Sequence, residues 1–270
     1  MIDIGVNLGN SQLSAQSESV LTRALDSGIE HCVLTGTDLT TSQEVLHLAQ
    51  QLNHTFPNML TCTAGVHPHD AKTWTSSTAE ELLDLLSNPL VVAVGEAGLD
   101  FNRNFSTPEQ QTTAFIGQIE LAKITGKPLF LHERDAFTHQ LDILKVHRDD
   151  FDDAVIHCFT GEKKALFAYL DLGLHIGITG WVCDERRGQA LASLVANIPL
   201  DRLMIETDAP YLLPRNIQPK PASRVNEPCY LPWIAKKIAA CYGVETIQIT
   251  EATSANARVF FGLDAVFSGR

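Results

Sequence analysis

The stretch VVAVGEAGLD, residues 91–100, decides how the rest of the chain is interpreted. Its first four residues, Val91–Val94, are small or β-branched and apolar, which is typical of a strand buried in a core. The run then reaches Gly95 and a carboxylate at Glu96. A charge is costly to bury without a partner, so the sequence raises the question of what Glu96 meets at the end of this strand.

Short apolar runs of the same kind recur along the whole chain, and most are followed by an amphipathic stretch long enough for a helix. Their shortness, their β-branched residues and the glycine or proline beside them favour strands over buried helix fragments. Eight strands are predicted, over residues 2–6, 32–36, 62–66, 90–96, 128–132, 153–157, 174–179 and 202–207.

The segments between the strands carry helix start and stop signals. In the clearest of them, Thr107 can cap the helix, Pro108 suits its first position, and Gln110 completes a capping box. Gly126 can end the same helix. Eight strand–helix alternations without a break in composition predict an α/β fold, a TIM-like (β/α)8 barrel formed as a single domain by residues 1–270. The competing architecture is an open doubly wound sheet, but no GxGxxG turn follows the first predicted strand.

Composition narrows the functional classes. The chain has 20 basic and 32 acidic residues and a net charge of −12, which argues against a general basic surface for duplex DNA but leaves room for a local phosphate site built around metal cations. No signal peptide is expected, and no stretch reaches the roughly 18 apolar residues that a membrane span needs, so we expect no membrane association. Six scattered cysteines without a CxxC pair predict reduced thiols in a cytoplasmic protein.

Polar residues of one kind stand at the carboxyl ends of the predicted strands, where barrels of this type build their active sites. Glu96 ends the fourth strand, His132 the fifth and His157 the sixth. Asp208 follows the eighth strand, and His67 follows the third. A single histidine or carboxylate in such a position is more often a cap or a core-edge residue. Glu96, His132, His157 and Asp208 are all metal-type ligands that would face the same end of the barrel. Together they predict a metal site instead, for Mg2+, Mn2+ or Zn2+.

Arginines just past the strand ends are candidates for contacts with a substrate phosphate. Arg103 lies in DFNRN and Arg134 in HERDA. Each can either pair with a carboxylate or bind a phosphate, since the guanidinium fork fits both. Arg186 and Arg187, in WVCDERRG, also have two interpretations. They belong either to a loop that contacts phosphate after the seventh strand or to the charged start of a helix.

Seven ordered motifs make the chain resemble the TatD family of metal-dependent deoxyribonucleases, most closely its bacterial branch. They are DIGVNL (3–8), GVHPHD (65–70), GEAGLDFNRN (95–104), LHERDA (131–136), HCFTG (157–161), GITGWVCDERRG (177–188) and ETDAPYLLPR (206–215). The resemblance covers essentially the whole length, and the seven motifs together are specific where no single one would be. It implies a TIM-like barrel, a divalent metal, and hydrolysis of nucleic-acid phosphodiesters.

The resemblance to the bacterial branch implies a more specific activity. It implies removal of nucleotides in the 3′→5′ direction from single-stranded DNA, and also RNA, with Mg2+ in the cytoplasm. The 3′ ends of such strands are then the expected partners, with DNA repair or nucleic-acid turnover as the purpose. We expect the enzyme to be a monomer.

Residue by residue, the resemblance also implies roles at the site. Glu96 matches the family's bridging carboxylate ligand, and His132 and His157 match its two imidazole ligands. Asp208 matches the aspartate that ligates metal and helps to orient the attacking water. His67 matches a histidine beside the site that contacts substrate. Glu96 and Asp208 are then the catalytic carboxylates.

One departure from the family pattern lies on the first strand. Most members open with a His-x-His pair, and here the two positions are Gly5 and Asn7. The first metal position therefore lacks both imidazoles. We expect one ion held firmly by the glutamate and the two histidine ligands, and a second recruited weakly through Glu96, Asp208 and the substrate phosphate.

Two other functions are compatible with the same barrel. A metal-dependent amidohydrolase acting on a small cyclic amide or ester would share the fold. Such enzymes typically use the first-strand histidine pair, and often a modified lysine that ends the fourth strand where this chain has Glu96. A binding protein that kept the barrel and lost the chemistry would explain the missing pair, but the four intact ligands argue against it.

Overall fold

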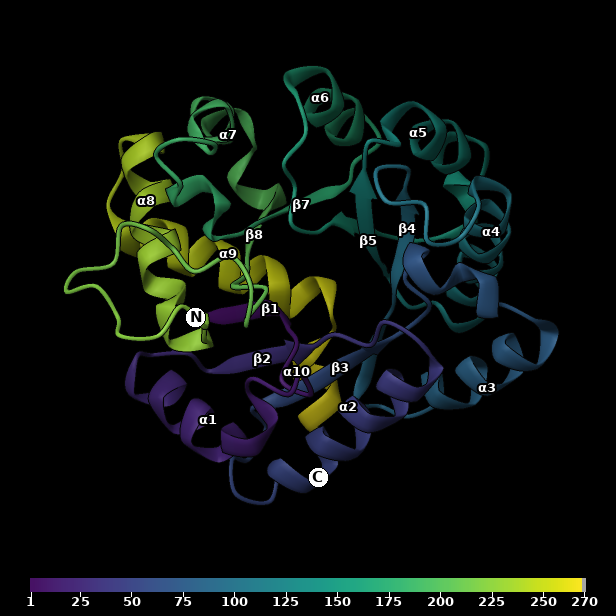
Figure 1. The fold of residues 1–270 in the computed structure, drawn as a ribbon, viewed down its shortest axis with the longest axis horizontal. Helices are drawn as coiled ribbons and strands as arrows, with labels where there is room; N and C mark the ends of the chain where they lie inside the picture. Colours follow the sequence, from purple (N-terminus) through teal and green to yellow (C-terminus); the bar gives the residue numbers. More distant parts are fainter. Residues whose placement is uncertain (269–270) are drawn as a thin grey trace.

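The computed structural model describes residues 1–268, and within them eight parallel strands form one sheet in the order of the sequence (Figure 1). The strands are β1 (Ile2–Val6), β2 (His31–Leu34), β3 (Leu60–Ala64), β4 (Val91–Asp100), β5 (Leu129–Arg134), β6 (Ala154–Ile156), β7 (His175–Ile178) and β8 (Leu203–Ile205). A doubly wound sheet would reverse its strand order at a switch point. The TIM-like barrel is therefore confirmed, and the competing architecture is wrong.

A ring of helices surrounds the strands (Figure 1). The helices are α1 (Ser17–Asp26), α2 (Leu39–Leu52), α3 (Ser76–Leu86), α4 (Pro108–Thr125), α5 (Phe137–Val146), α6 (Lys163–Asp171), α7 (Gln189–Leu194), α8 (Leu231–Tyr242), α9 (Thr246–Phe260) and α10 (Leu263–Ser268). The signals predicted for α4 are confirmed, because Thr107 and Gln110 exchange side-chain and backbone hydrogen bonds and Gly126 ends the helix at φ 65°. Among residues 1–268, no helix combines the length and the apolar character that crossing a membrane requires.

The barrel closes just beyond β8, where the chain returns alongside β1. The Asp208 amide donates to the Gly5 carbonyl at 2.9 Å, and the Asn7 amide donates to the Ala209 carbonyl at 2.8 Å. A parallel bridge between Val6 and Ala209 completes this seam. The seam places Asp208 beside Asn7 at the carboxyl end of the strands.

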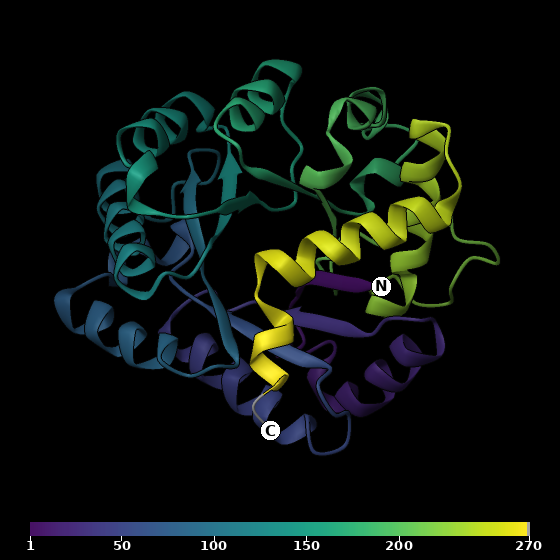
Figure 2. The ribbon, with the colours of Figure 1, turned by 180° about the vertical axis from the view of Figure 1, so that it is seen from behind.

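The interior of the barrel is apolar at its amino-terminal end. Figure 2 shows α9 and α10 lying across the side of the barrel that faces away from the viewer in Figure 1. Ala257, Phe260, Phe261 and Leu263 of this segment form one buried cluster with strand residues such as Ile2. Because this cluster closes the amino-terminal end, the carboxyl end of the barrel is the end left for a site.

Alternation along the strands makes the interior polar toward the carboxyl end. Side chains two residues apart on a strand face the same side, so a residue two positions beyond an interior apolar residue also faces inward. Three such pairs, each with its first member in the apolar interior cluster, are Phe130 and His132, Val155 and His157, and Met204 and Glu206.

The fourth strand is longer than predicted. It runs to Asp100, and its pairing with β5 shifts register around Gly95. Gly95 has φ 148°, and a Cβ there would overlap the Phe130 carbonyl, so only glycine fits this irregularity. The prediction that the strand ends on Glu96 is wrong. Glu96 lies within the strand at the irregularity, and the strand ends on a second carboxylate, Asp100.

His31, the first residue of β2, couples the stability of this fold to pH. Its ring is buried, with Nδ1 3.0 Å from the Asn58 carbonyl oxygen and Nε2 2.8 Å from Thr61 Oγ1. Burial lowers the pKa of His31 from 6.5 to about 4. Between these two values the unfolded chain binds a proton that the folded chain does not. The contribution of His31 to stability is therefore complete above the upper value and is lost as the pH falls.

We predict that His31→Gln removes part of the acid sensitivity of the fold. Between about pH 7 and about pH 5, protonation of His31 in the unfolded chain should lower the unfolding free energy of the wild-type protein by about 2 kcal/mol. Urea unfolding of wild type and variant at both pH values measures this difference. An equal loss of stability in the two proteins would contradict the assignment to His31.

Candidate metal centre

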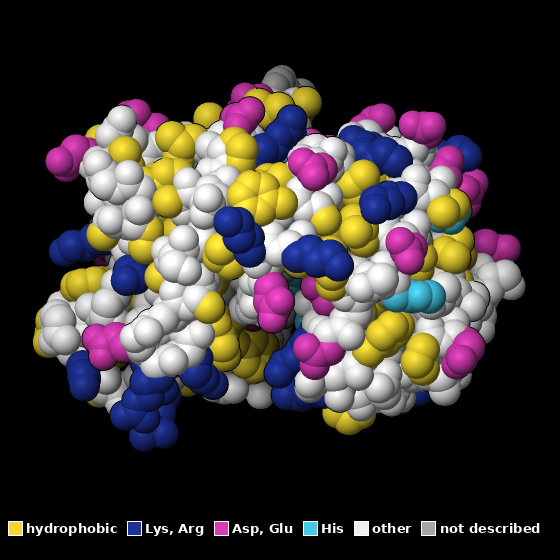
Figure 3. All heavy atoms as spheres, turned by 90° about the horizontal axis from the view of Figure 1, so that it is seen from above, with side chains coloured by type: hydrophobic (Ala, Val, Ile, Leu, Met, Phe, Trp, Pro, Cys, Tyr) yellow, Lys and Arg dark blue, Asp and Glu magenta, His cyan; other side chains and the backbone are white. Residues whose placement is uncertain are grey.

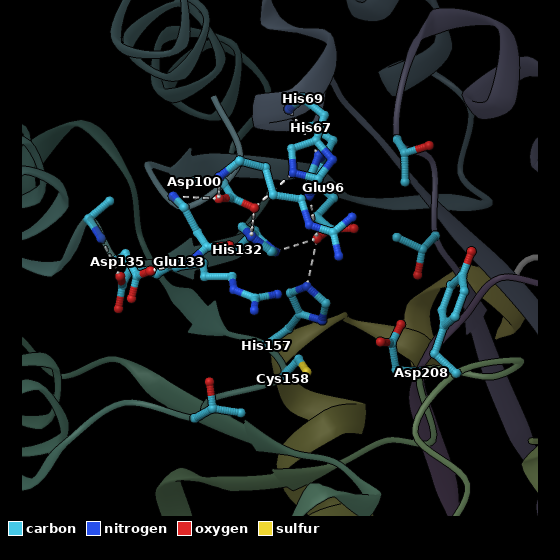
Figure 4. A pocket seen from close by; sticks show the side chains of 18 of the residues that line it. His67, His69, Glu96, Asp100, His132, Glu133, Asp135, His157, Cys158 and Asp208 are labelled. Carbon is cyan, nitrogen blue, oxygen red and sulfur yellow. Dashed lines mark hydrogen bonds and ion pairs between the residues drawn. The ribbon is translucent and has the colours of Figure 1, made fainter. Parts of the chain in front are cut away.

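A cavity of about 1490 Å³ opens at the carboxyl end of the barrel. The side chains that the sequence put forward for the site all line this cavity: His67, Glu96, Arg103, His132, Arg134, His157 and Asp208. They come from segments far apart in the sequence, so it is the closure of the barrel that brings them together. Figure 4 shows how the labelled members lie.

One oxygen of Glu96 is the point on which the imidazoles converge (Figure 4). His157 Nε2 lies 2.8 Å from Glu96 Oε1, His132 Nδ1 lies 3.1 Å from it, and His67 Nε2 lies 3.4 Å from it. His132 is on β5, whereas His157 directly follows β6 and His67 precedes a 3-10 turn after β3. The barrel thus presents three rings, from segments on both sides of β4, to one carboxylate on β4.

The charges in this cluster stabilise one another. Burial alone would raise the pKa of Glu96, but the neighbouring imidazoles of His157 and His67, with hydrogen bonds from His132 and His157, hold it well below its usual range. Burial would likewise lower the pKa of His157, but Glu96 and Glu206 raise it well above its usual value. A histidine must be neutral to bind a metal ion, so a divalent cation at this point would take the place of ring protons.

A second carboxylate lies beside the far nitrogen of His132. His132 Nε2 is buried and makes no hydrogen bond within residues 1–268, and the nearest carboxylate oxygen, Asp100 Oδ2, lies 3.5 Å away. The same oxygen is 2.8 Å from His69 Nε2. When a cation takes the place of a proton on Nδ1 beside Glu96, the remaining ring proton is on Nε2, where Asp100 is the nearest acceptor.

His67 has the opposite arrangement. Its Nδ1 accepts a hydrogen bond from the His69 amide at 3.1 Å, so the proton of the neutral ring is on Nε2, which faces Glu96. Burial lowers the pKa of His67 to about 3, which keeps the ring neutral. His67 is thus a hydrogen-bond donor at the edge of the cluster, and its tautomer is unsuited to metal ligation.

Asp208 stands apart from this cluster. It lines the same cavity, and Figure 4 shows it on the other side from Asp100. Asp208 Oδ1 accepts a hydrogen bond from Asn7 Nδ2 at 3.0 Å. Burial raises the pKa of Asp208 to about 7. The structure therefore brings together Glu96, His132 and His157 in mutual contact, with Asp208 across the cavity.

The arginines divide into two groups. Arg103 and Arg134 are exposed at the mouth, and in the described part of the chain neither guanidinium makes an ion pair, which leaves both free for a phosphate. Asp184, by contrast, accepts hydrogen bonds from the amides of Arg186 and Arg187 and forms an ion pair with the Arg187 side chain. These contacts make the Arg187 side chain part of the loop structure after β7, whereas Arg186 contributes only its amide.

Sequence reasoning missed three residues of this region: His69, Asp100 and Glu206. His69 stands two residues after His67 in GVHPHD, so the motif itself contained the signal. Asp100 was missed because the fourth strand was predicted to end at Glu96. The strand runs on to Asp100 and places that side chain at the mouth of the barrel. Glu206 was read only as the last part of the eighth strand.

The donor set fits a divalent cation. His67, Glu96 and His132 offer atoms that all lie within 4.8 Å of one another, a spacing suited to one ion. His157 is the better third ligand, because its far nitrogen Nδ1 lies 3.3 Å from a Glu206 oxygen and can keep a ring proton while Nε2, 2.8 Å from Glu96 Oε1, gives its proton up to the ion. His67 Nδ1 accepts from an amide and cannot take over the ring proton in this way. One carboxylate oxygen and two imidazole nitrogens are ligand types that Mg2+, Mn2+ and Zn2+ all accept.

Comparison with known proteins agrees with this geometry. The family model described as TatD related DNase matches residues 2–262. The chain is 52% identical to the "3'-5' ssDNA/RNA exonuclease TatD" of Edwardsiella piscicida over 263 residues, which are 97% of this chain and 100% of that protein. It is 50% identical to the protein of the same description from Klebsiella pneumoniae over 264 residues, 98% of each. A hydrolase TatD family protein from Entamoeba histolytica has a similar structure, with a TM-score of 0.88 and 25% identity over 97% of both chains.

We predict that metal affinity separates the three histidines. His132→Ala and His157→Ala should each weaken Mn2+ binding by at least about 100-fold, since each removes a ligand nitrogen, a larger loss than the 10–100-fold typical of outer-shell partners. His67→Gln keeps an N–H donor toward Glu96 and should change the Mn2+ affinity by no more than about threefold. Titration calorimetry with Mn2+ measures all three. A loss in His67→Gln as large as that in His132→Ala would show that His67 is a ligand.

Proposed function

The chain belongs to the family of TatD related DNases, and we propose that it is a metal-dependent 3′→5′ exonuclease that hydrolyses phosphodiester bonds of single-stranded DNA and RNA. The observation that carries this proposal is the convergence of His132 and His157 on one oxygen of Glu96 at the mouth of the barrel. The direction of hydrolysis and the substrate follow the names of the relatives that match the chain over nearly its full length.

Glu96, His132 and His157 are the ligands of a first divalent ion in this proposal. When bound, such an ion activates water and neutralises charge that grows on the phosphoryl oxygens. We favour Mg2+, because a hard cation keeps several waters, borrows phosphate oxygens and tolerates a site with few protein ligands; Mn2+ and Zn2+ are the alternatives. Glu96 and Asp208, together with the substrate phosphate, would hold a second ion weakly.

Asp208 acts as the proton acceptor. Burial raises the pKa of Asp208 to about 7. At neutral pH a large fraction of Asp208 is therefore ionised, and this carboxylate can take up a proton from the attacking water. The hydrogen bond from Asn7 Nδ2 fixes the direction in which the Asp208 carboxylate faces. Asp208 and Glu96, which both line the cavity, are thus the two catalytic carboxylates of this proposal.

His67, Arg103 and Arg134 bind the substrate. The Nε2–H group of His67 donates to a phosphoryl oxygen when substrate enters, and the free guanidinium groups at the mouth bind the neighbouring phosphates. On the face drawn in Figure 3, Lys and Arg side chains lie among Asp and Glu side chains, in keeping with the net charge of −12. A polyanion is therefore held by local contacts at the mouth and by bound cations.

The wider setting of the enzyme is also proposed. We place it in the cytoplasm as a monomer whose residues 1–270 form one catalytic domain, and we assign it to DNA repair or nucleic-acid turnover.

Glu96→Ala tests the proposed function. Loss of the carboxylate on which the rings converge should abolish hydrolysis of labelled single-stranded DNA at saturating Mg2+, while the circular dichroism spectrum stays native because Glu96 adds no apolar surface to the core. Near-normal activity would refute the assignment. Dihydroorotate is the second substrate to be tested, with metal-loaded wild-type protein. Turnover of dihydroorotate without hydrolysis of DNA would establish the amidohydrolase alternative.

We predict that a single-stranded 3′ end is hydrolysed faster than the same end in a blunt duplex. A cup lined by loops admits one chain end, so each base-pair step of a duplex must first be opened at a cost of about 1.4 kcal/mol. Time courses on the two ends, at matched salt and sequence, measure the ratio, which should be about tenfold or more for one opened step. Equal rates would contradict the account of the cup.

A further inference from the structure

Glu206 is a fully buried carboxylate directly after β8 to which the proposed chemistry assigns no role. Its Oε1 accepts a hydrogen bond from the Cys158 amide at 2.5 Å. Its Oε2 lies 3.3 Å from His157 Nδ1, the ring nitrogen that faces away from Glu96. Glu206 therefore contacts the far side of a ring whose near side belongs to the metal centre.

Two glycines make room for this carboxylate. A Cβ on Gly5 would overlap Glu206 Oε2, and a Cβ on Gly177 would lie 2.8 Å from Glu206 Oε1, closer than real Cβ atoms approach. Gly5 is the position at which the family pattern has the first histidine of its pair. In this chain the carboxylate of Glu206 takes up the space beside that position, so a histidine there would require Glu206 to move.

We propose that Glu206 is a positioning residue that keeps the Nδ1 proton on His157 and so directs the Nε2 lone pair to the metal centre. The proposal rests on the proposed metal ligation by His157. An ionised carboxylate can only accept hydrogen bonds, so His157 Nδ1 must be the donor to Oε2. With the proton held at Nδ1, the nitrogen that a metal ion can bind is Nε2, which lies 2.8 Å from Glu96 Oε1.

A purely structural role for Glu206 is a weaker explanation of these contacts. The Cys158 amide needs one acceptor, and the oxygen of a neutral glutamine would satisfy it without the cost of burying a charge. What only the carboxylate provides is a second acceptor aimed at His157 Nδ1. The two explanations therefore separate on replacement of Glu206 by glutamine.

Glu206→Gln is the first test, because it keeps the shape and removes one acceptor. The glutamine oxygen stays on the Cys158 amide, which turns the NH2 group toward His157 Nδ1 and requires that nitrogen to accept. The ring then keeps its proton on Nε2, in competition with the metal. Mn2+ affinity measured by titration calorimetry should fall by about 10- to 100-fold, as for other partners that orient metal-binding histidines. An unchanged affinity in the folded variant would overturn the proposal.

Gly5→Ala is the second test, since it keeps Glu206 in the chain but displaces Oε2, the oxygen that faces His157 Nδ1. It should weaken Mn2+ binding in the same direction, and the double variant with Glu206→Gln should lose less than the product of the two single effects, because both act through one contact. Independent, multiplicative losses would overturn the proposal. Gly9→Ala is the matched control and should leave Mn2+ affinity unchanged, since a Cβ on Gly9 meets only Val45, at 3.7 Å.

The wild-type protein supplies a readout that needs no variant. In Zn2+-loaded protein with 15N-labelled histidine, His157 should show a proton on Nδ1 and none on Nε2, and the reverse tautomer would overturn the proposal even if both variants failed to fold. His157→Ala separates this result from the function itself. If His157→Ala loses Mn2+ affinity and Glu206→Gln does not, the positioning role is wrong and the metal centre stands. If neither loses it, the ligand assignment is wrong as well.

Discussion

The oxygen Oε1 of Glu96 is the point on which the rest of this structure depends. A buried carboxylate is tolerated only when partners compensate its charge, and here the compensation comes from imidazoles on segments to both sides of β4, one after β3, one on β5 and one after β6. The answer to the question raised by VVAVGEAGLD is therefore that Glu96 meets ring nitrogens, and the same nitrogens suit a cation. The glycine before Glu96 belongs to this arrangement, because the register irregularity at Gly95 is where the carboxylate enters the cluster.

The three histidines around Glu96 differ in what lies behind them. His132 has Asp100 behind its far nitrogen, His157 has Glu206, and His67 has a backbone amide. A carboxylate behind a ring keeps a proton there and frees the near nitrogen, whereas an amide donor has the opposite effect. In the proposed site, polar groups one layer out thus decide which of three similar rings binds metal and which donates to substrate.

Local signals in the sequence predicted the fold well. The capping box from Thr107 to Gln110 and the left-handed Gly126 act within one turn of chain, so α4 was placed correctly, and the alternation of apolar runs and helices identified the barrel. The ligands at strand ends were also found, since β5 and β6 deliver them wherever the exact strand boundary falls. Asp100 and Glu206 were not found, because their roles depend on the register of β4 against β5 and on the room left by Gly5 and Gly177 from other strands. No local pattern encodes such contacts.

The most direct test of this account is the position of a metal ion in a crystal grown with Mn2+. The account predicts an anomalous scattering peak bonded to Glu96, to Nδ1 of His132 and to Nε2 of His157, with His67 too far away to coordinate and Asp208 across the cavity. A peak bonded to His67 in place of His157 would contradict the assignment of ring protons. A peak that leaves Glu96 without contact would contradict the central claim that its oxygen organises the site.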